Sequence, residues 1–161
     1  RLGWTVSPPS LIPSYAMLNE FNIASPPPFV QIAGAEALDK GEAHISDMMA
    51  ELRRKRDYVC QRLADCPAVR IAAPEAAFYA FFAVEGMTDS LAAAKTILSR
   101  SGVGLAPGIA FGGHGEGYLR LCFAASMHKL EQAMDKLVPL LKDAPASLSD
   151  MNTRERNDNA Q

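Results

Sequence analysis

Arg120 is the residue whose type and position most need a chemical explanation. It lies in the segment YLRLCF at residues 118–123, where the alternation of a strand places Tyr118, Arg120 and Cys122 on one face. A guanidinium is rarely desolvated without a partner, and its planar fork fits a carboxylate through two parallel N–H donors. The pattern alone favours a structural salt bridge or an exposed strand face, and a bound carboxylate is the functional alternative.

A glycine-rich loop precedes this strand. Residues 106–117 read APGIAFGGHGEG and contain five glycines. Such a loop can adopt positive φ and bring its backbone close to a ligand. The loop lacks the GK[ST] ending of a P-loop and the GxGxxG spacing of a dinucleotide site, so it is no nucleotide signature. A flexible connector is the alternative to a ligand-binding role.

The remaining candidate residues give weaker signals. The segment PEAAFYAFF at residues 74–82 is dense in aromatic residues, which is typical of a core strand, although Phe78 could line a pocket. We predict no metal site, because the three histidines have no mutual metal-ligand spacing. The three cysteines form no C-x-x-C pair, so neither a disulfide framework nor a thiolate site is indicated. These residues are His44, His114, His128, Cys60, Cys66 and Cys122.

Composition excludes several classes of partner. The chain is 48% hydrophobic and has a formal net charge of −2, so it has no general field that would attract nucleic acid or an anionic membrane. The basic run RRKR at residues 53–56 falls within an expected helix, whose successive side chains point around the axis. No apolar run approaches the roughly 20 residues that cross a bilayer. We expect a protein of the reducing cytoplasm, with no nucleic-acid or membrane partner.

Hydrophobic periodicity predicts the elements that must position these residues. Helices are expected from Ser10 or Pro13 to about 22 and at about 29–38, 45–64, 89–99 and 128–142, and strands at 69–72, 78–84, 103–105 and 118–123. The order predicts a small α+β domain with helices on one face of a mostly antiparallel sheet. The first helix should bury Leu11, Tyr15, Leu18 and Phe21, and the last should bury Leu130, Met134, Leu137 and Leu141.

Taken in order, four motifs resemble the carboxy-terminal part of the class I/II aminotransferases, which are fold type I pyridoxal-phosphate enzymes. RLGW at residues 1–4 resembles the end of the family's Gly-Trp-Arg-Leu-Gly-Trp motif, and PEAAFY at 74–79 resembles Pro-x-Gly-[Ala/Thr]-Phe-Tyr. PGIAFG at 107–112 is similar to Pro-Gly-x-x-Phe-Gly, and GYLRL at 117–121 to Gly-x-x-Arg-[Leu/Ile]. The resemblance spans about residues 1–142.

The resemblance implies an α/β fold of the fold type I pyridoxal-phosphate transferases. This chain would be mainly the small C-terminal α+β domain, with the end of the large domain before it. Residues 1–30 would end the large cofactor-binding domain, and residues 31–66 would form a long interdomain helical segment. The small domain would occupy residues 67–142. Residues 143–161 are polar and are expected to form a disordered tail.

Site residues follow from the same resemblance. Arg120 would bind the substrate α-carboxylate and Phe78 would line the substrate pocket. Arg1 would bind the phosphate of pyridoxal 5'-phosphate, and Ser25 would lie near the cofactor phosphate of a neighbouring subunit in a homodimer. Ala76 stands where the family usually has glycine, which puts in doubt a close approach of the backbone to substrate there.

The resemblance also implies a catalytic group that we cannot assign to this chain. The family forms a Schiff base between a lysine and the cofactor, and that lysine then moves the substrate proton. No lysine here follows a serine and precedes Gly-x-Arg as the motif requires: Lys40, Lys55, Lys95, Lys129, Lys136 and Lys142. We therefore expect the catalytic lysine upstream of Arg1, and we expect this chain alone to be inactive.

The aminotransferase and three alternatives remain open on these residues. The first is an aminotransferase acting on an amino acid and a 2-oxo acid. The second is a same-fold lyase or synthase, because one fold hosts several chemistries. The third is an aminotransferase-like effector domain of a transcription regulator. The fourth is a free-standing α+β binding module, in which Arg120 would face solvent or a local acid.

Overall fold

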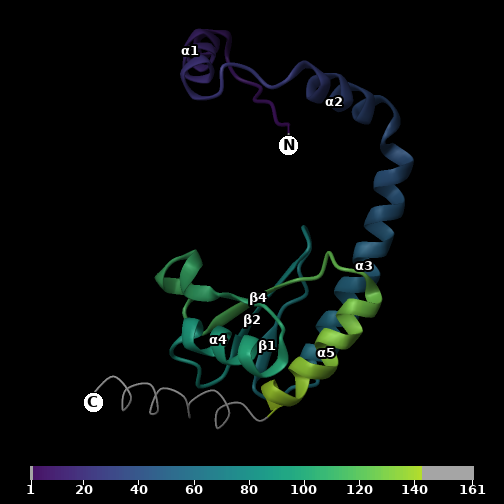
Figure 1. The fold of residues 1–161 in the computed structure, drawn as a ribbon, viewed down its shortest axis with the longest axis vertical. Coiled ribbons are helices and arrows are strands. Elements are labelled where there is room, and N and C mark those ends of the chain that lie inside the picture. The colour runs from purple at the N-terminus through teal and green to yellow at the C-terminus, as the bar shows by residue number, and fades with distance from the viewer. Residues whose placement is uncertain (1, 143–161) are drawn as a thin grey trace. The chain divides into compact units, whose positions relative to one another are not determined.

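The computed structural model describes residues 2–142, which fold as two compact units (Figure 1). The boundary between the units falls between Met49 and Ala50, inside the helix α3 (Glu42–Ala64). Each unit is described by itself below.

The first unit is helical. A 3-10 turn (Pro9–Leu11) leads into α1 (Ile12–Asn22), and α2 (Pro28–Lys40) follows. Prolines stand in the first turn of each helix, where the backbone N–H groups lack intrahelical partners in any case. The expected helices are confirmed.

The expected burial along the first helix is wrong. No residue of α1 is buried, and Leu18 and Phe21 are 65% and 85% exposed. Leu11 and Tyr15 are each 45% exposed. Periodicity identifies the apolar side of a helix, but within residues 2–142 no element covers that side.

The second unit contains an antiparallel sheet with strand order β1-β2-β4-β3. The strands are β1 (Val69–Ile71), β2 (Tyr79–Val84), β3 (Ala106–Pro107) and β4 (Tyr118–Cys122). Arg120 lies opposite Phe81 on one side and Ala106 on the other. The register thus fixes which side chains surround Arg120.

The strand expected at residues 103–105 is wrong, because pairing with β4 begins only at Ala106. Val103 follows the left-handed cap at Gly102 (φ 72°), and its N–H donates to Ser101 Oγ at 3.1 Å. Val103 and Leu105 pack partly buried against the core without joining the sheet. Their strand propensity reflects this burial and not ladder pairing.

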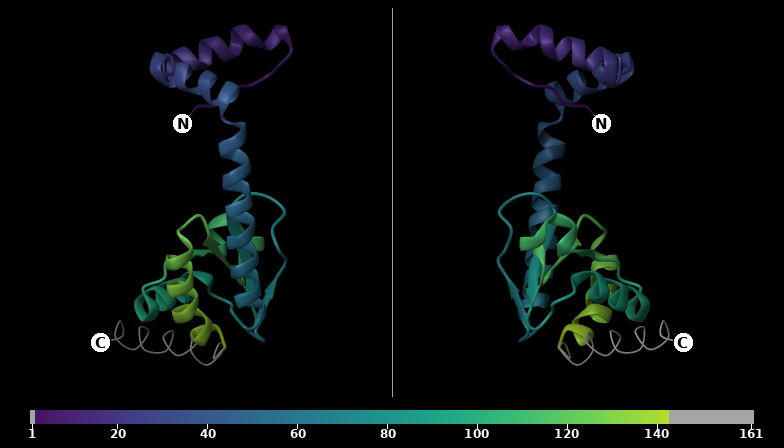
Figure 2. Two further views of the ribbon diagram at one scale, coloured as in Figure 1. Left: turned by 90° about the vertical axis from the view of Figure 1, so that its right-hand side faces the viewer. Right: turned by 90° about the vertical axis from the view of Figure 1, so that its left-hand side faces the viewer.

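Helices cover one face of the sheet. The C-terminal part of α3, α4 (Ser90–Ser101) and α5 (Met127–Lys142) pack against alternate residues of β2 and β4. Figures 1 and 2 show α5 beside α3, where Arg62 Nη2 donates to Asp135 Oδ1 at 2.9 Å. The expected inward face of the last helix is confirmed, since its four named residues are at most 2% exposed: Leu130, Met134, Leu137 and Leu141.

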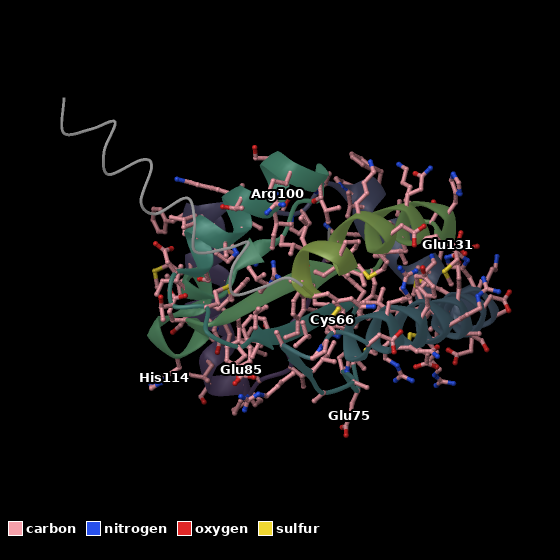
Figure 3. All side chains as sticks on the ribbon, turned by 90° about the horizontal axis from the view of Figure 1, so that it is seen from below. Cys66, Glu75, Glu85, Arg100, His114 and Glu131 are labelled. Atoms are coloured by element: carbon pink, nitrogen blue, oxygen red, sulfur yellow. The ribbon has the colours of Figure 1, made fainter. Side chains whose placement is uncertain are left out.

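The buried cysteine illustrates this interior. Figure 3 shows Cys66 inside the second unit, whereas Glu75 projects outward. The Cys66 sulfur lies within hydrogen-bond distance of the carbonyl oxygens of Arg62 and Val138, at 3.8 and 3.9 Å, so its single S–H has two available acceptors, and burial raises the pKa of this thiol. Among residues 2–142, no helix is long and apolar enough to cross a membrane.

Candidate functional site

The face of the sheet opposite the helices carries aromatic side chains around Arg120. Strand alternation places Tyr79 and Phe81 of β2 on the same face as Tyr118 and Arg120 of β4. The Phe81 and Tyr118 rings stack with centroids 4.9 Å apart and planes 10° apart. The Phe111 ring meets Phe81 edge to face, with centroids 5.8 Å apart.

The guanidinium of Arg120 lies close to two aromatic rings. Its Cζ atom is 4.2 Å from the centroid of Tyr79 and 4.2 Å from that of Phe111. A cation over an aromatic face is attracted by the ring quadrupole. Such a contact does not require the N–H donors of the guanidinium, which point outward in its plane.

Arg120 has no acidic partner in the part of the chain that the structure describes. Over residues 2–142 its guanidinium takes part in none of the ion pairs or side-chain hydrogen bonds. The side chain is half-buried. Within residues 2–142 the salt-bridge interpretation is therefore wrong, whereas the exposed-face interpretation stays open, because Tyr118 and Cys122 on the same face of β4 are exposed. A half-buried cation with free in-plane donors suits a bound carboxylate.

The glycine-rich loop forms two 3-10 turns, Gly108–Phe111 and Gly113–Gly115. Their backbones are in close contact, since a Cβ built on Gly108 would lie 1.8 Å from the Gly115 carbonyl oxygen. Gly112 has a φ of 104°, which favours glycine. This loop is a packed unit and not an open connector, and it carries Phe111 to Arg120.

Glu116 fastens the loop to α4, and the sequence interpretation missed it. Glu116 Oε1 accepts hydrogen bonds from the backbone N–H groups of Ser90 at 2.6 Å and Gly117 at 3.0 Å. The Gly117 bond, followed by those of Ser90, holds the pKa of Glu116 below its ordinary value. Ile109 N donates to Ser90 Oγ at 3.1 Å. The only sequence signal is an acidic residue within a glycine-rich loop, and this signal does not reveal the partner.

The other expected site residues lie in different parts of the chain. Phe78 belongs to the second unit and is 38% exposed, and its ring centroid is 4.7 Å from that of Tyr79. The structure thus brings Phe78 and Arg120 to the same aromatic cluster. Ser25 belongs to the first unit, where it is exposed in the segment between α1 and α2. Arg1 lies outside the described residues.

Ala77, immediately before Phe78, has a φ of 62°. The left-handed region is unfavourable for a residue with a Cβ. We expect Ala77→Gly to stabilise the protein by about 0.5–1 kcal/mol. Ala76 has no positive φ, so Ala76→Gly should instead destabilise it by about 0.5–1 kcal/mol. Thermal and denaturant unfolding of both variants would check this, and equal effects at the two positions would contradict it.

Comparison with known protein families identifies the family of this chain. The family profile described as "Aminotransferase class I and II" matches residues 1–137. The chain belongs to the class I and II aminotransferase family. The resemblance carried by the four motifs is thereby confirmed.

Individual aminotransferases are also similar to this chain in sequence. An aspartate aminotransferase of Pyrococcus horikoshii is 35% identical over 145 residues, covering 88% of this chain and 37% of that protein. An aromatic-amino-acid aminotransferase of Thermococcus litoralis is 32% identical over 148 residues, covering 89% and 37%. This chain therefore spans little more than a third of the length of these aminotransferases.

A solved aminotransferase structure has the same fold. The crystal structure of an aromatic aminotransferase from Pyrococcus horikoshii matches with a TM-score of 0.79 and 31% identity, over 85% of this chain and 37% of that one. The expected fold class, part of a fold type I aminotransferase of mixed helix and sheet, is confirmed.

Proposed function

We propose that this chain is the carboxy-terminal part of a pyridoxal-phosphate-dependent aminotransferase that transfers an amino group between an amino acid and a 2-oxo acid. The supporting observation is the Arg120 guanidinium, which lies 4.2 Å from each of two ring centroids and has no acidic partner within residues 2–142. Both amino acids and 2-oxo acids carry the carboxylate that such a group binds.

In this proposal Arg120 binds the α-carboxylate through two parallel N–H donors. Tyr79 and Phe111 fix the plane of the guanidinium, and thereby fix the direction in which the carboxylate is held. Orientation of a reacting group supplies a large part of enzymatic rate enhancement. Phe78, which contacts the Tyr79 ring and is 38% exposed, lines the space for the substrate.

Pyridoxal 5'-phosphate, the cofactor implied by the family, accepts electrons from the substrate when it is bound. Ser25 fits a role at its phosphate, because its hydroxyl makes no hydrogen bond within residues 2–142 and it precedes the first turn of α2, where anions are favoured. Arg1 would supply a cationic donor to the same phosphate. The lysine of the family motif would precede Arg1.

The wider assignments form part of the same proposal. The protein would be a cytoplasmic homodimer whose substrates are small molecules. Residues 1–30 would end the large domain, residues 31–66 would connect the domains, and residues 67–142 would form the small domain; the expected tail at 143–161 lies outside the described residues. A lyase, synthase or regulator is not favoured, since the relatives reported above are named aminotransferases.

Product analysis of the full-length protein tests the proposal. With pyridoxal phosphate, an amino acid and a 2-oxo acid, we expect equal amounts of the exchanged pair. The α-carboxamide of the same amino acid should have a kcat/KM at least about tenfold lower, because a hydrogen bond to a charged group is lost. The 161-residue chain is the control and should not exceed the rate of free cofactor. Formation of ammonia or carbon dioxide in place of the exchanged pair would contradict transamination.

A further inference from the structure

Glu116 is the acidic residue closest in sequence to Arg120, yet its carboxylate accepts hydrogen bonds from backbone N–H groups and forms no ion pair with Arg120 within residues 2–142. Its Oε1 atom accepts from Ser90 N at 2.6 Å and from Gly117 N at 3.0 Å. We propose that Glu116 is a positioning residue, which fastens the 108–117 loop to the first turn of α4 and so holds Phe111 against Arg120. This inference rests on the proposed function, in which Arg120 binds the substrate carboxylate.

The anchor for Glu116 is the beginning of α4. Ser90, the first residue of this helix, is 0% exposed. Asp89 caps the helix by accepting from Ala92 N at 2.9 Å, which leaves the Ser90 N–H for Glu116. N–H groups in a first turn have no intrahelical acceptor, and the positive end of the helix dipole favours a carboxylate. Glu116 therefore binds a buried and charge-complementary point on α4.

Ser90 also connects to the turn that carries Phe111. Its Oγ atom accepts from Ile109 N at 3.1 Å, and Ile109 O accepts from Gly112 N at 3.1 Å across the Gly108–Phe111 turn. The bond to Ser90 thus holds the first part of the Gly108–Phe111 turn, and the bond between Gly112 and Ile109 closes its end. Both hydrogen bonds to Ser90 come from the loop, one at each end of the segment 109–116.

Phe111 is the member of the aromatic pair that depends on this attachment. Tyr79 is held by β2, which pairs with β4 along its length. Phe111 lies in the loop and is 47% exposed, and its ring contacts within residues 2–142 are those with Phe81 and Arg120. Releasing the loop removes one ring from the guanidinium and leaves its plane less constrained. Glu116 thus affects binding of the substrate carboxylate through Phe111 and does not contact the substrate itself.

The experiment compares Glu116→Ala, Phe111→Leu and the double variant in the full-length protein. Glu131→Ala is the control, because Glu131 is exposed on α5 (Figure 3). We measure KM and kcat for the amino acid, and the proton chemical shift of the Arg120 Nε–H group. Ring currents shift this proton while both rings cover the guanidinium, so its resonance reports their positions without turnover.

We expect Glu116→Ala to raise KM about three- to tenfold with little change in kcat, the range set by one cation–π contact. The Arg120 Nε–H resonance should move toward that of free arginine. The double variant should match Phe111→Leu alone, since both changes remove the same contact. Glu131→Ala should match the parent in both measurements.

Three results would overturn the proposal. One is a lower melting temperature with KM and the Nε–H resonance unchanged, which would make Glu116 structural only. Another is additive effects in the double variant. If Glu116→Ala does not fold, Ser90→Ala takes its place, because it removes the acceptor of Ile109 N. This variant should reproduce the changes in KM and in the Nε–H resonance. Parent-like values of both would be the third contradicting result. If the unsubstituted full-length protein shows no transamination, the proposed function is refuted and not this inference. The Arg120 Nε–H resonance then still tests whether Glu116 holds Phe111 against Arg120.

Discussion

Replacing Arg120 with lysine in the full-length protein should lower kcat/KM for the amino acid by about 100-fold. Lysine keeps the positive charge but loses the planar fork. Hydrogen bonds to charged groups are worth about 1.5–3 kcal/mol each, and 1.4 kcal/mol is a factor of ten, so the loss of one of two such bonds accounts for this size. The ammonium also cannot lie flat against the Tyr79 and Phe111 rings. Cofactor absorbance should change little.

Arg70→Lys is the matched control for this prediction. Arg70 is 77% exposed on its side chain, and its ion-pair partner within residues 2–142 is Glu85, at 3.7 Å. Its replacement should leave kcat/KM and stability within error of the parent, because exposed ion pairs contribute little. If Arg120→Lys lowers the melting temperature but leaves kcat/KM unchanged, Arg120 supports the sheet and does not bind substrate.

Gly108→Ala should destabilise the protein by about 3 kcal/mol, at the upper end of the usual range for overpacking. The added Cβ would lie 1.8 Å from the Gly115 oxygen and 2.6 Å from the Tyr118 oxygen. Both atoms belong to the backbone, so neither can move aside as a side chain would. The loop must open, and Phe111 must leave Arg120. We therefore expect kcat/KM to fall together with the unfolding free energy.

Gly113→Ala separates this effect from a general intolerance of the loop. A Cβ on Gly113 would have nothing within 4 Å, so its effect should stay within about 0.5 kcal/mol. Urea unfolding and steady-state kinetics of the two variants give the comparison. Equal destabilisation by both substitutions would show that the close contact of the two turns does not cause the loss of stability in Gly108→Ala.

The sequence predicted α5 and its buried face correctly, but not the burial of α1. Leu130 and Met134 pack against strands and helices of the same unit, so an apolar stripe there has a partner. Leu18 in α1 has the same kind of pattern but is 65% exposed. Periodicity measures the side chains of one helix, whereas burial depends on a second surface.

The site was predicted in part. Strand alternation singled out Arg120, because an arginine on a partly buried face needs a partner. It did not reveal that Tyr79 and Phe111 would be this partner, since their positions depend on sheet register and on the fold of the loop. Glu116 was missed for a related reason: its role lies in hydrogen bonds to backbone N–H groups, which leave no pattern in residue types.

Pro107 affects more than the loop that it opens. It ends β3, which at two residues is one outer strand of the sheet in the described part of the chain. Outer strands expose unpaired N–H and C=O groups that can recruit another chain, and proline offers no N–H for such pairing. The other outer strand, β1, has only three residues and carries the exposed Arg70. Both edges of this sheet are therefore poor templates for aggregation.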